Sequence, residues 1–173
     1  MTPNEELAHA LAALHAASFG WALACTGRRR DDAVDVLQDA YAKVLSGAAR
    51  YDGRAPLKTW FFGVVRLTAL EHRRGAAVRF LFGARRGADP ALAPVAPVAG
   101  DVATADREIA RAVAEALAAL PDRQREVVHL VFYEELTIEE ASHVMGVALG
   151  TARLHYDRGK KRLAELLQAR GIR

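Results

Sequence analysis

The most suggestive chemistry in this sequence lies between residues 137 and 162, where hydrogen-bond donors follow a short capped segment. Thr137 and Glu140 have the spacing of a capping box, in which a threonine starts a helix and a glutamate at the third helical position closes it. Gly146 suits the exit of that helix. The segment that follows is rich in arginine and lysine, so the pair has the pattern of a helix-turn-helix, whose second helix enters the major groove of DNA.

The donors of this second helix are of two chemical kinds. Arg153 and Arg158 can form paired hydrogen bonds to guanine, and His155 can add a single one. Thr151 stands among small residues at the helix start, where exposed backbone amides favour phosphate. Lys161 lies further along and suits the phosphate backbone. A plain helical hairpin has the same outline, so this pattern alone is moderately specific.

Basic residues concentrate in two zones of a chain whose formal net charge is only +3. Nine basic residues against two acidic ones lie within 50–86, and seven against two within 153–173. Acidic residues gather instead within 31–39 and 134–140. Solvated surface charge explains most single runs of this kind. Two basic zones that coincide with helical motifs favour two contacts with a nucleic acid, plus surfaces for another partner.

Signals for an enzyme or a metal site are weak. Six histidines are scattered without metal-ligand spacing, and no glycine-rich phosphate loop occurs. Cys25 is the single cysteine, which excludes an internal disulfide and a cysteine-based zinc site. No apolar run approaches the roughly 20 residues of a membrane span, and Glu5 and Glu6 stand where a signal peptide carries positive charge. We expect a cytoplasmic protein without catalytic activity, cofactor, bound metal or membrane insertion.

The first half of the chain has three segments of helical periodicity. One helix is expected from residue 4 to about residue 26. A second should begin at Asp31 or Asp32, either of which is a good N-cap. Its apolar stripe comprises Val34, Leu37, Tyr41 and Val44. A turn-rich stretch over 50–56 precedes a third helix, expected from Pro56 to Gly75.

The amino-acid composition changes over residues 83–104. Proline, alanine and glycine occur there without a sustained hydrophobic period, as is typical of a flexible linker. Further helices are expected from Asp106 to Leu120, from Asp122 to Phe132, from Thr137 to Met145 and from about Leu149 to Arg170. The sequence therefore predicts an all-α protein. Two small helical domains, over 1–82 and 105–173, are joined by the linker.

Two sets of motifs resemble the sigma-70 family of bacterial transcription factors. LPDRQREVV at 120–128, LTIEEA at 136–141, GTAR at 150–153 and RGKKRL at 158–163 are similar to region 4 of that family. DAVDVLQDAY at 32–41, RYD at 50–52 and LKTWFF at 57–62 are similar to region 2. These two regions alone are the layout of the extracytoplasmic-function (ECF) group. The resemblance implies an initiation factor that binds core RNA polymerase and directs it to promoter DNA at −35 and −10 elements.

The resemblance also implies a role for each zone. Region 2 would bind polymerase through outer residues of the second helix, namely Asp35, Gln38 and Asp39. Melting of the −10 element needs aromatic and basic groups that hold unstacked bases, and the residues of these types are Tyr51, Arg54, Lys58, Phe61, Arg66, Arg73 and Arg74. Region 4 would read the −35 element with Arg125, Thr151, Arg153, Leu154, His155, Arg158 and Lys161. For Trp60 and Phe61, packing in the protein core is the alternative to contact with the −10 element. For Trp60, core packing is the stronger interpretation.

Three positions depart from the usual family pattern. Leu67 stands where members carry asparagine in the −10 base pocket, and Leu154 and His155 replace the usual serine and arginine. These differences bear on promoter sequence and not on the family. An anti-sigma factor acting in trans is a further implied partner. The alternative function is a helix-turn-helix regulator that acts without being a polymerase subunit, which leaves the acidic helix and the basic stretch over 50–74 unexplained.

Overall fold

The computed structural model describes residues 3–81 and 104–172, and the regular elements in these ranges are all α-helices. The all-α prediction is therefore confirmed for the described residues. The chain divides into two compact units, one within Met1–Leu92 and one within Ala93–Arg173. The linker predicted over 83–104 lies outside the described residues, apart from Thr104, which begins a helix.

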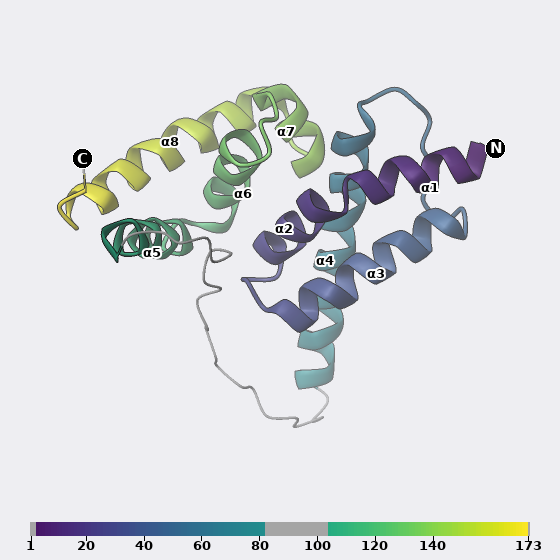
Figure 1. Ribbon diagram of the computed structural model, residues 1–173, viewed down its shortest axis with the longest axis horizontal. Coiled ribbons are helices and arrows are strands. Elements are labelled where there is room, and N and C mark those ends of the chain that lie inside the picture. Colours follow the sequence, from purple (N-terminus) through teal and green to yellow (C-terminus); the bar gives the residue numbers. More distant parts are fainter. Residues whose placement is uncertain (1–2, 82–103, 173) are drawn as a thin grey trace. The chain divides into compact units, whose positions relative to one another are not determined.

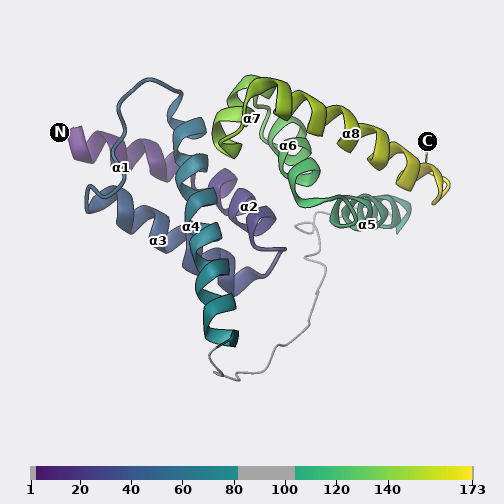
Figure 2. The same ribbon diagram turned by 180° about the vertical axis from the view of Figure 1, so that it is seen from behind.

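Four helices form the first unit: α1 (Pro3–Ala13), α2 (His15–Cys25), α3 (Arg30–Leu45) and α4 (Leu57–Leu81). α2 and α3 lie side by side and α4 crosses both (Figure 1; Figure 2 from behind). Trp21, Phe61 and Phe62 are fully buried between them. The Trp21 indole N–H donates to the Phe62 carbonyl oxygen at 3.0 Å, and the two rings stack with centroids 5.9 Å apart. This aromatic core holds α2 against α4.

The single helix expected over 4–26 is two helices in the structure. Leu14, with φ −91° and ψ 0°, lies between α1 and α2, and the two helices are bent by 67° at this break. Leu11 before the break and Trp21 after it are both buried. No single described helix is long and apolar enough to cross a membrane. The bent pair of α1 and α2, taken together, reaches that length and apolar composition.

α3 begins at Arg30 and buries a face that differs from the predicted stripe. Arg29 holds the N-cap position without a side-chain cap, so neither Asp31 nor Asp32 caps the helix. Both lie in its first turn, where a carboxylate favours the positive end of the helix dipole. The buried residues are Ala33, Val36, Leu37, Ala40 and Val44, whereas Val34 is 37% exposed. The face is rotated because α3 packs against α2 and α4 together.

α4 continues to Leu81, beyond the end expected at Gly75. A glycine weakens a helix interior without breaking it, and the alanines that follow, Ala76 and Ala77, are the strongest helix formers. The added turns are solvent-facing, since Phe80 and Leu81 are each 79% exposed. The apolar side chains at this end therefore do not extend the core of the first unit.

The second unit consists of α5 (Thr104–Ala118), α6 (Asp122–Phe132), α7 (Ile138–Met145) and α8 (Leu149–Gln168). α8 packs against each of the other three (Figure 1). The core is aliphatic and includes Leu120, Val127, Val128, Leu130 and Met145. Neither Asp106 nor Asp122, where these helices were expected to begin, is the cap of its helix: α5 begins earlier, at Thr104, and Pro121 holds the N-cap position of α6. Both aspartates lie in the first turn of their helix.

Candidate nucleic-acid interface

Local capping sets the turn between α7 and α8. The Thr137 hydroxyl oxygen accepts from the Glu140 backbone N–H at 3.1 Å, and the Glu140 carboxylate accepts from the Thr137 N–H at 2.8 Å. The predicted capping box is therefore confirmed. Gly146 ends α7 in the left-handed conformation, with φ 64°, which glycine adopts at little cost. Since α8 starts at Leu149, the two helices form a helix-turn-helix.

α8 packs on α6 through its smallest residues. Ala152 and Gly159, seven positions apart, are the buried residues of α8 and lie on the same face of the helix. A Cβ atom at Gly159 would lie 3.0 Å from Val128 Cγ2 and 3.2 Å from the Gln124 carbonyl oxygen. Because even a methyl group would be crowded there, glycine allows α8 to approach α6 closely on this face.

The face of α8 that turns outward carries most of the predicted −35 residues. Thr151, Arg153, Leu154, Arg158 and Lys161 are exposed, and His155 is half-buried. Within the described residues, the cations Arg153, Arg158 and Lys161 form no ion pair or hydrogen bond with another side chain. Their donors are therefore free to bind phosphate oxygens or the guanine edge, which accept such donors.

Arg125, predicted to bind the −35 element, is engaged within the protein. Its guanidinium pairs with the Asp122 carboxylate at 2.5 Å. It also donates to the carbonyl oxygens of Ala118 and Leu120, each at 3.2 Å. These contacts join the end of α5 to the start of α6. The Arg125 side chain, 26% exposed, therefore belongs to the helix junction and not to the outward face of α8.

The residues predicted to bind polymerase lie together on α3. All three are exposed: Asp35, Gln38 and Asp39. Asp39 also joins α3 to α4, because its carboxylate lies 2.6 Å from His72 Nε2. A second pair along the same helix interface joins Lys43 to Glu71 at 2.5 Å. This acidic surface is therefore partly engaged in holding the first unit together.

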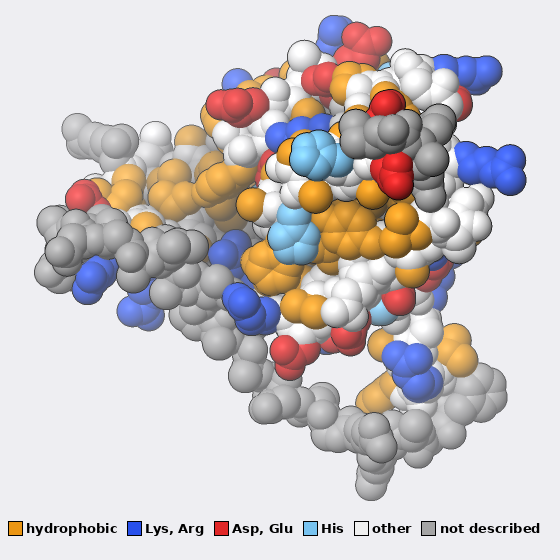
Figure 3. Space-filling view, turned by 45° about the vertical axis from the view of Figure 1, so that its right-hand side comes forward, with side chains coloured by type: hydrophobic (Ala, Val, Ile, Leu, Met, Phe, Trp, Pro, Cys, Tyr) orange, Lys and Arg blue, Asp and Glu red, His pale blue; other side chains and the backbone are white. Residues whose placement is uncertain are grey.

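A shallow groove of about 290 Å³ lies beside this acidic surface, between α2 and α3. Phe19 from α2 and Leu37, Gln38 and Tyr41 from α3 line it. Figure 3 shows hydrophobic side chains next to histidines on one face of the protein. The Tyr41 hydroxyl lies 3.1 Å from His15 Nδ1, and burial raises the pKa of Tyr41. Sequence reasoning missed this groove because it forms only when α2 packs on α3.

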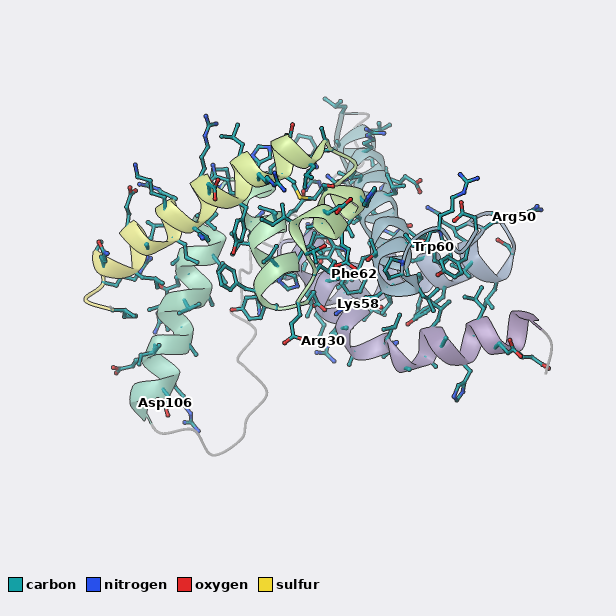
Figure 4. The ribbon with its side chains drawn as sticks, turned by 90° about the horizontal axis from the view of Figure 1, so that it is seen from above. Arg30, Arg50, Lys58, Trp60, Phe62 and Asp106 are labelled. Carbon is teal, nitrogen blue, oxygen red and sulfur yellow. The ribbon has the colours of Figure 1, made fainter. Side chains whose placement is uncertain are left out.

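An aromatic pair marks the point where the loop after α3 meets α4. The rings of Tyr51 and Trp60 have centroids 5.1 Å apart and are inclined by 48°. The Tyr51 hydroxyl donates to the Ala55 carbonyl oxygen at 2.7 Å, which steadies the loop. In Figure 4, Trp60 lies on the side of α4 nearest the loop that carries Arg50, and Lys58 lies on the other side. Both residues of the pair are partly exposed.

Two residues predicted to contact the −10 element are buried in this fold. Phe61 is 0% exposed and Arg66 is 5% exposed, so neither side chain is on the surface of the first unit. Core packing was predicted more strongly for Trp60 than for Phe61, and the structure shows the opposite. Phe61 fills the core between α2, α3 and α4, and Trp60 remains partly exposed. Adjacent helix positions point about 100° apart, so the packing partner decides which of the two is buried.

The basic residues of this zone remain accessible. Arg54, Arg73 and Arg74 are exposed, and Arg54 lies 3.4 Å from the Asp52 carboxylate. Lys58 is half-buried with its Nζ 5.4 Å from the centroid of the Phe62 ring. No group of three or more histidine, cysteine or carboxylate side chains with the geometry of a metal site occurs among the described residues. The available chemistry is therefore that of cations and aromatic rings.

Comparison with known protein families matches both units of the chain. Residues 12–79 match the family model of sigma-70 region 2, and residues 116–165 match that of sigma-70 region 4. The chain belongs to the sigma-70 family. It is 32% identical over 146 residues to the ECF RNA polymerase sigma factor SigM of Mycobacterium tuberculosis, covering 82% of this chain and 67% of that protein. It is 27% identical over 172 residues to the sigma factor CnrH of Cupriavidus metallidurans, covering 96% and 89%.

A solved structure supports the same fold for this sigma factor. The sigma factor RpoE of Bartonella quintana, solved in complex with the anti-sigma factor NepR, superposes with a TM-score of 0.72 at 23% identity, covering 95% of this chain and 98% of that one. As a sigma factor of the ECF group, the protein binds core RNA polymerase and directs it to promoters. The alternative of a regulator that works apart from polymerase is not favoured, because region 2 is matched as well as region 4.

Proposed function

We propose that this sigma factor reads the −35 element with the outward face of α8, melts the −10 element beside Tyr51 and Trp60, and binds polymerase with the acidic surface of α3. The observation that carries the first assignment is the set of exposed cations on α8, Arg153, Arg158 and Lys161, which have no ion-pair partner among the described residues and lie away from the buried face at Gly159. A guanidinium already engaged within the protein, as in Arg125, has fewer donors left for DNA. The free cations are therefore the preferred contacts.

Arg153 and Arg158 would serve different base pairs. They are five positions apart, which is more than one helical turn, so one base pair cannot take both. Each paired contact with guanine discriminates against a wrong base by roughly 1–3 kcal/mol. Lys161 lies further along α8 and would hold a phosphate, which contributes affinity without sequence preference.

Transcription from promoters with single-base changes in the −35 element, measured at two salt concentrations, tests these roles. We expect Arg153→Ala and Arg158→Ala each to relax preference at particular positions. Lys161→Ala should weaken all promoters alike and flatten the salt dependence. Arg111→Ala removes the same charge from α5, where it is 76% exposed, and should leave promoter choice unchanged.

One result would assign base recognition to other residues of α8. If Arg153→Ala and Arg158→Ala weaken every promoter equally, both arginines contact phosphates. Base reading would then fall to Leu154 and His155, whose side chains lie on or beside the same face. No effect of any α8 variant on transcription would contradict the proposed interface as a whole.

The polymerase contact follows from exposed polar groups next to an apolar groove. Asp35 and Gln38 are exposed on α3, and Gln38 also lines the groove. We expect Asp35→Ala combined with Gln38→Ala to weaken core binding in a titration, with helix content unchanged. Asp106→Ala removes an exposed carboxylate from the first turn of α5 and serves as the charge control. Unchanged core affinity in the double variant would contradict this role.

Melting of the −10 element is assigned to the exposed aromatic pair. Stacking of a base on an aromatic side chain contributes roughly 1–3 kcal/mol, and the rings of Tyr51 and Trp60 are partly exposed. Trp60→Ala should therefore slow open-complex formation on duplex promoters. The defect should be smaller on a template with a pre-opened −10 bubble, because only the stacking contact is lost there and no base pair remains to be broken. Equal defects on both templates would place Trp60 in folding or polymerase binding instead.

Regulation by an anti-sigma factor, in the cytoplasm where polymerase acts, completes the proposal. CnrH, whose solved structure superposes with a TM-score of 0.62 at 24% identity, is bound to the cytosolic domain of CnrY, and RpoE is bound to NepR. We assign this chain a regulated initiation role without catalytic activity of its own. A purified candidate inhibitor should suppress transcription by this sigma factor and not by another sigma factor on its own promoter. Equal suppression of both would indicate an effect on polymerase.

A further inference from the structure

One acidic residue stands among the cations on the outward face of α8. Asp157 lies four positions after Arg153 and four before Lys161, so the three side chains form one row along the helix. Asp157 is exposed and, within the described residues, forms no ion pair or hydrogen bond with another side chain. Its position opposite the buried residues Ala152 and Gly159 places it on the face that we assign to DNA.

Other acids at comparable helical spacings in this chain do form ion pairs. Glu115 lies 2.9 Å from Arg111 on α5, and Glu165 lies 3.3 Å from Arg162 further along α8. Asp157 has cations at the same spacing on both sides and pairs with neither. A free carboxylate on a surface that meets a polyanion lowers affinity for phosphate, because like charges repel. Base recognition is a role in which such a group is useful.

We propose that Asp157 selects a cytosine in the −35 element by accepting a hydrogen bond from its N4 amino group in the major groove. This inference rests on the proposed entry of α8 into that groove. Carboxylates pair with this donor, and cytosine presents no acceptor beside it on the groove edge. Adenine also offers an amino group, but its N7 acceptor stands next to N6 and repels a carboxylate. Arg153 and Lys161, on either side in the row, offset the repulsion between Asp157 and nearby phosphates.

Selection of promoters from DNA with a randomised −35 element, using polymerase holoenzyme, tests the inference. With the unaltered chain, one position should favour cytosine by roughly fivefold to tenfold. Asp157→Ala should lose that preference and keep the others. Asp157→Asn should move it to adenine, since an asparagine amide can bond both N6 and N7. Glu165→Ala, which removes the same charge two turns further along α8, should leave the selected sequences unchanged.

Two results would overturn the inference in different ways. If Asp157→Ala selects the same sequences and binds all DNA more tightly, Asp157 is a bystander charge, and the assignment of α8 to the −35 element stands. If the unaltered chain selects no −35 sequence at all, α8 does not read DNA, and the proposed function fails together with this inference. The two failures are distinguished by whether −35 selection remains when the preference for cytosine does not depend on Asp157.

Discussion

The charged surfaces of the two units differ in whether their side chains have partners within the protein. On α3, Asp39 pairs with His72 and Lys43 pairs with Glu71, and both contacts join α3 to α4. On the outward face of α8, the charged side chains are exposed and have no such partner among the described residues: Arg153, Asp157, Arg158 and Lys161. The first surface therefore combines support of the fold with the proposed polymerase contact. The second is free for DNA, because its helix is held by the opposite face.

The cores of the units explain how this separation arises. The first core is aromatic, with Trp21, Phe61 and Phe62 fully buried. The second is aliphatic, and α8 approaches α6 closely through Gly159. Close backbone contact holds α8 without any side chain from its outward face. Substitutions in the two cores should therefore lower the free energy of unfolding by different amounts, and each needs its own control variant.

The largest expected effect is loss of the aromatic core in Phe62→Ala. The Phe62 ring is fully buried and stacks on Trp21, so truncation should lower the free energy of unfolding of the first unit by about 3–5 kcal/mol. Both tryptophans, Trp21 and Trp60, lie in this unit, so their fluorescence follows its unfolding. Leu67→Ala, on the same helix but 59% exposed, is the control and should change stability by about 0.5 kcal/mol or less. Equal losses in both variants would contradict an aromatic core.

Next in size is Gly159→Ala in the second unit. A methyl group there would meet Val128 Cγ2 at 3.0 Å and the Gln124 carbonyl oxygen at 3.2 Å. Overpacking of this kind costs about 1–3 kcal/mol, which exceeds the gain of up to about 1 kcal/mol from better helix propensity. Unfolding followed by circular dichroism should show the loss. Gly150→Ala, where a Cβ has open space, should be neutral or slightly stabilising. A more stable Gly159→Ala would mean that α8 is not held by this contact.

Sequence reasoning succeeded where a structure depends on neighbours along the chain. Thr137 and Glu140 are three positions apart, and Gly146 needs only its own backbone freedom, so the α7–α8 motif was predictable. The exposure of Asp35 and Arg153 was predictable for a related reason, because each lies outside the apolar pattern of its helix. Local chemistry and periodicity were sufficient for these features.

The features that were missed depend on packing between distant segments. The bend at Leu14 leaves the spacing of apolar residues unchanged, so periodicity cannot reveal it. Phe61 and Trp60 are both aromatic neighbours, and only the positions of α2 and α3 decide that Phe61 is the buried one. Arg125 is a residue type that suits DNA, and its engagement with the α5–α6 junction appears only once those helices are placed.

A smaller effect is expected from the cap of α7. Thr137→Ala removes the acceptor for the Glu140 N–H and should lower the free energy of unfolding of the second unit by about 1 kcal/mol. Thr137→Ser keeps a hydroxyl and should retain most of the stability. The loss should appear in thermal unfolding while tryptophan fluorescence of the first unit is unaffected, since both tryptophans lie there. Equal stability of the alanine and serine variants would show that the capping box is not needed for α7.

The smallest effect directly tests the difference between the charged surfaces. Glu71→Gln breaks the ion pair with Lys43 and should lower stability by about 0–1 kcal/mol, an effect that salt reduces because both side chains are solvent-accessible. Lys161→Ala removes a cation that has no partner among the described side chains, so it should leave stability unchanged while weakening promoter binding. Denaturant unfolding at low and high salt, paired with promoter affinity, separates the two. If Lys161→Ala costs as much stability as Glu71→Gln, the outward face of α8 supports the fold, and its charges are not reserved for DNA.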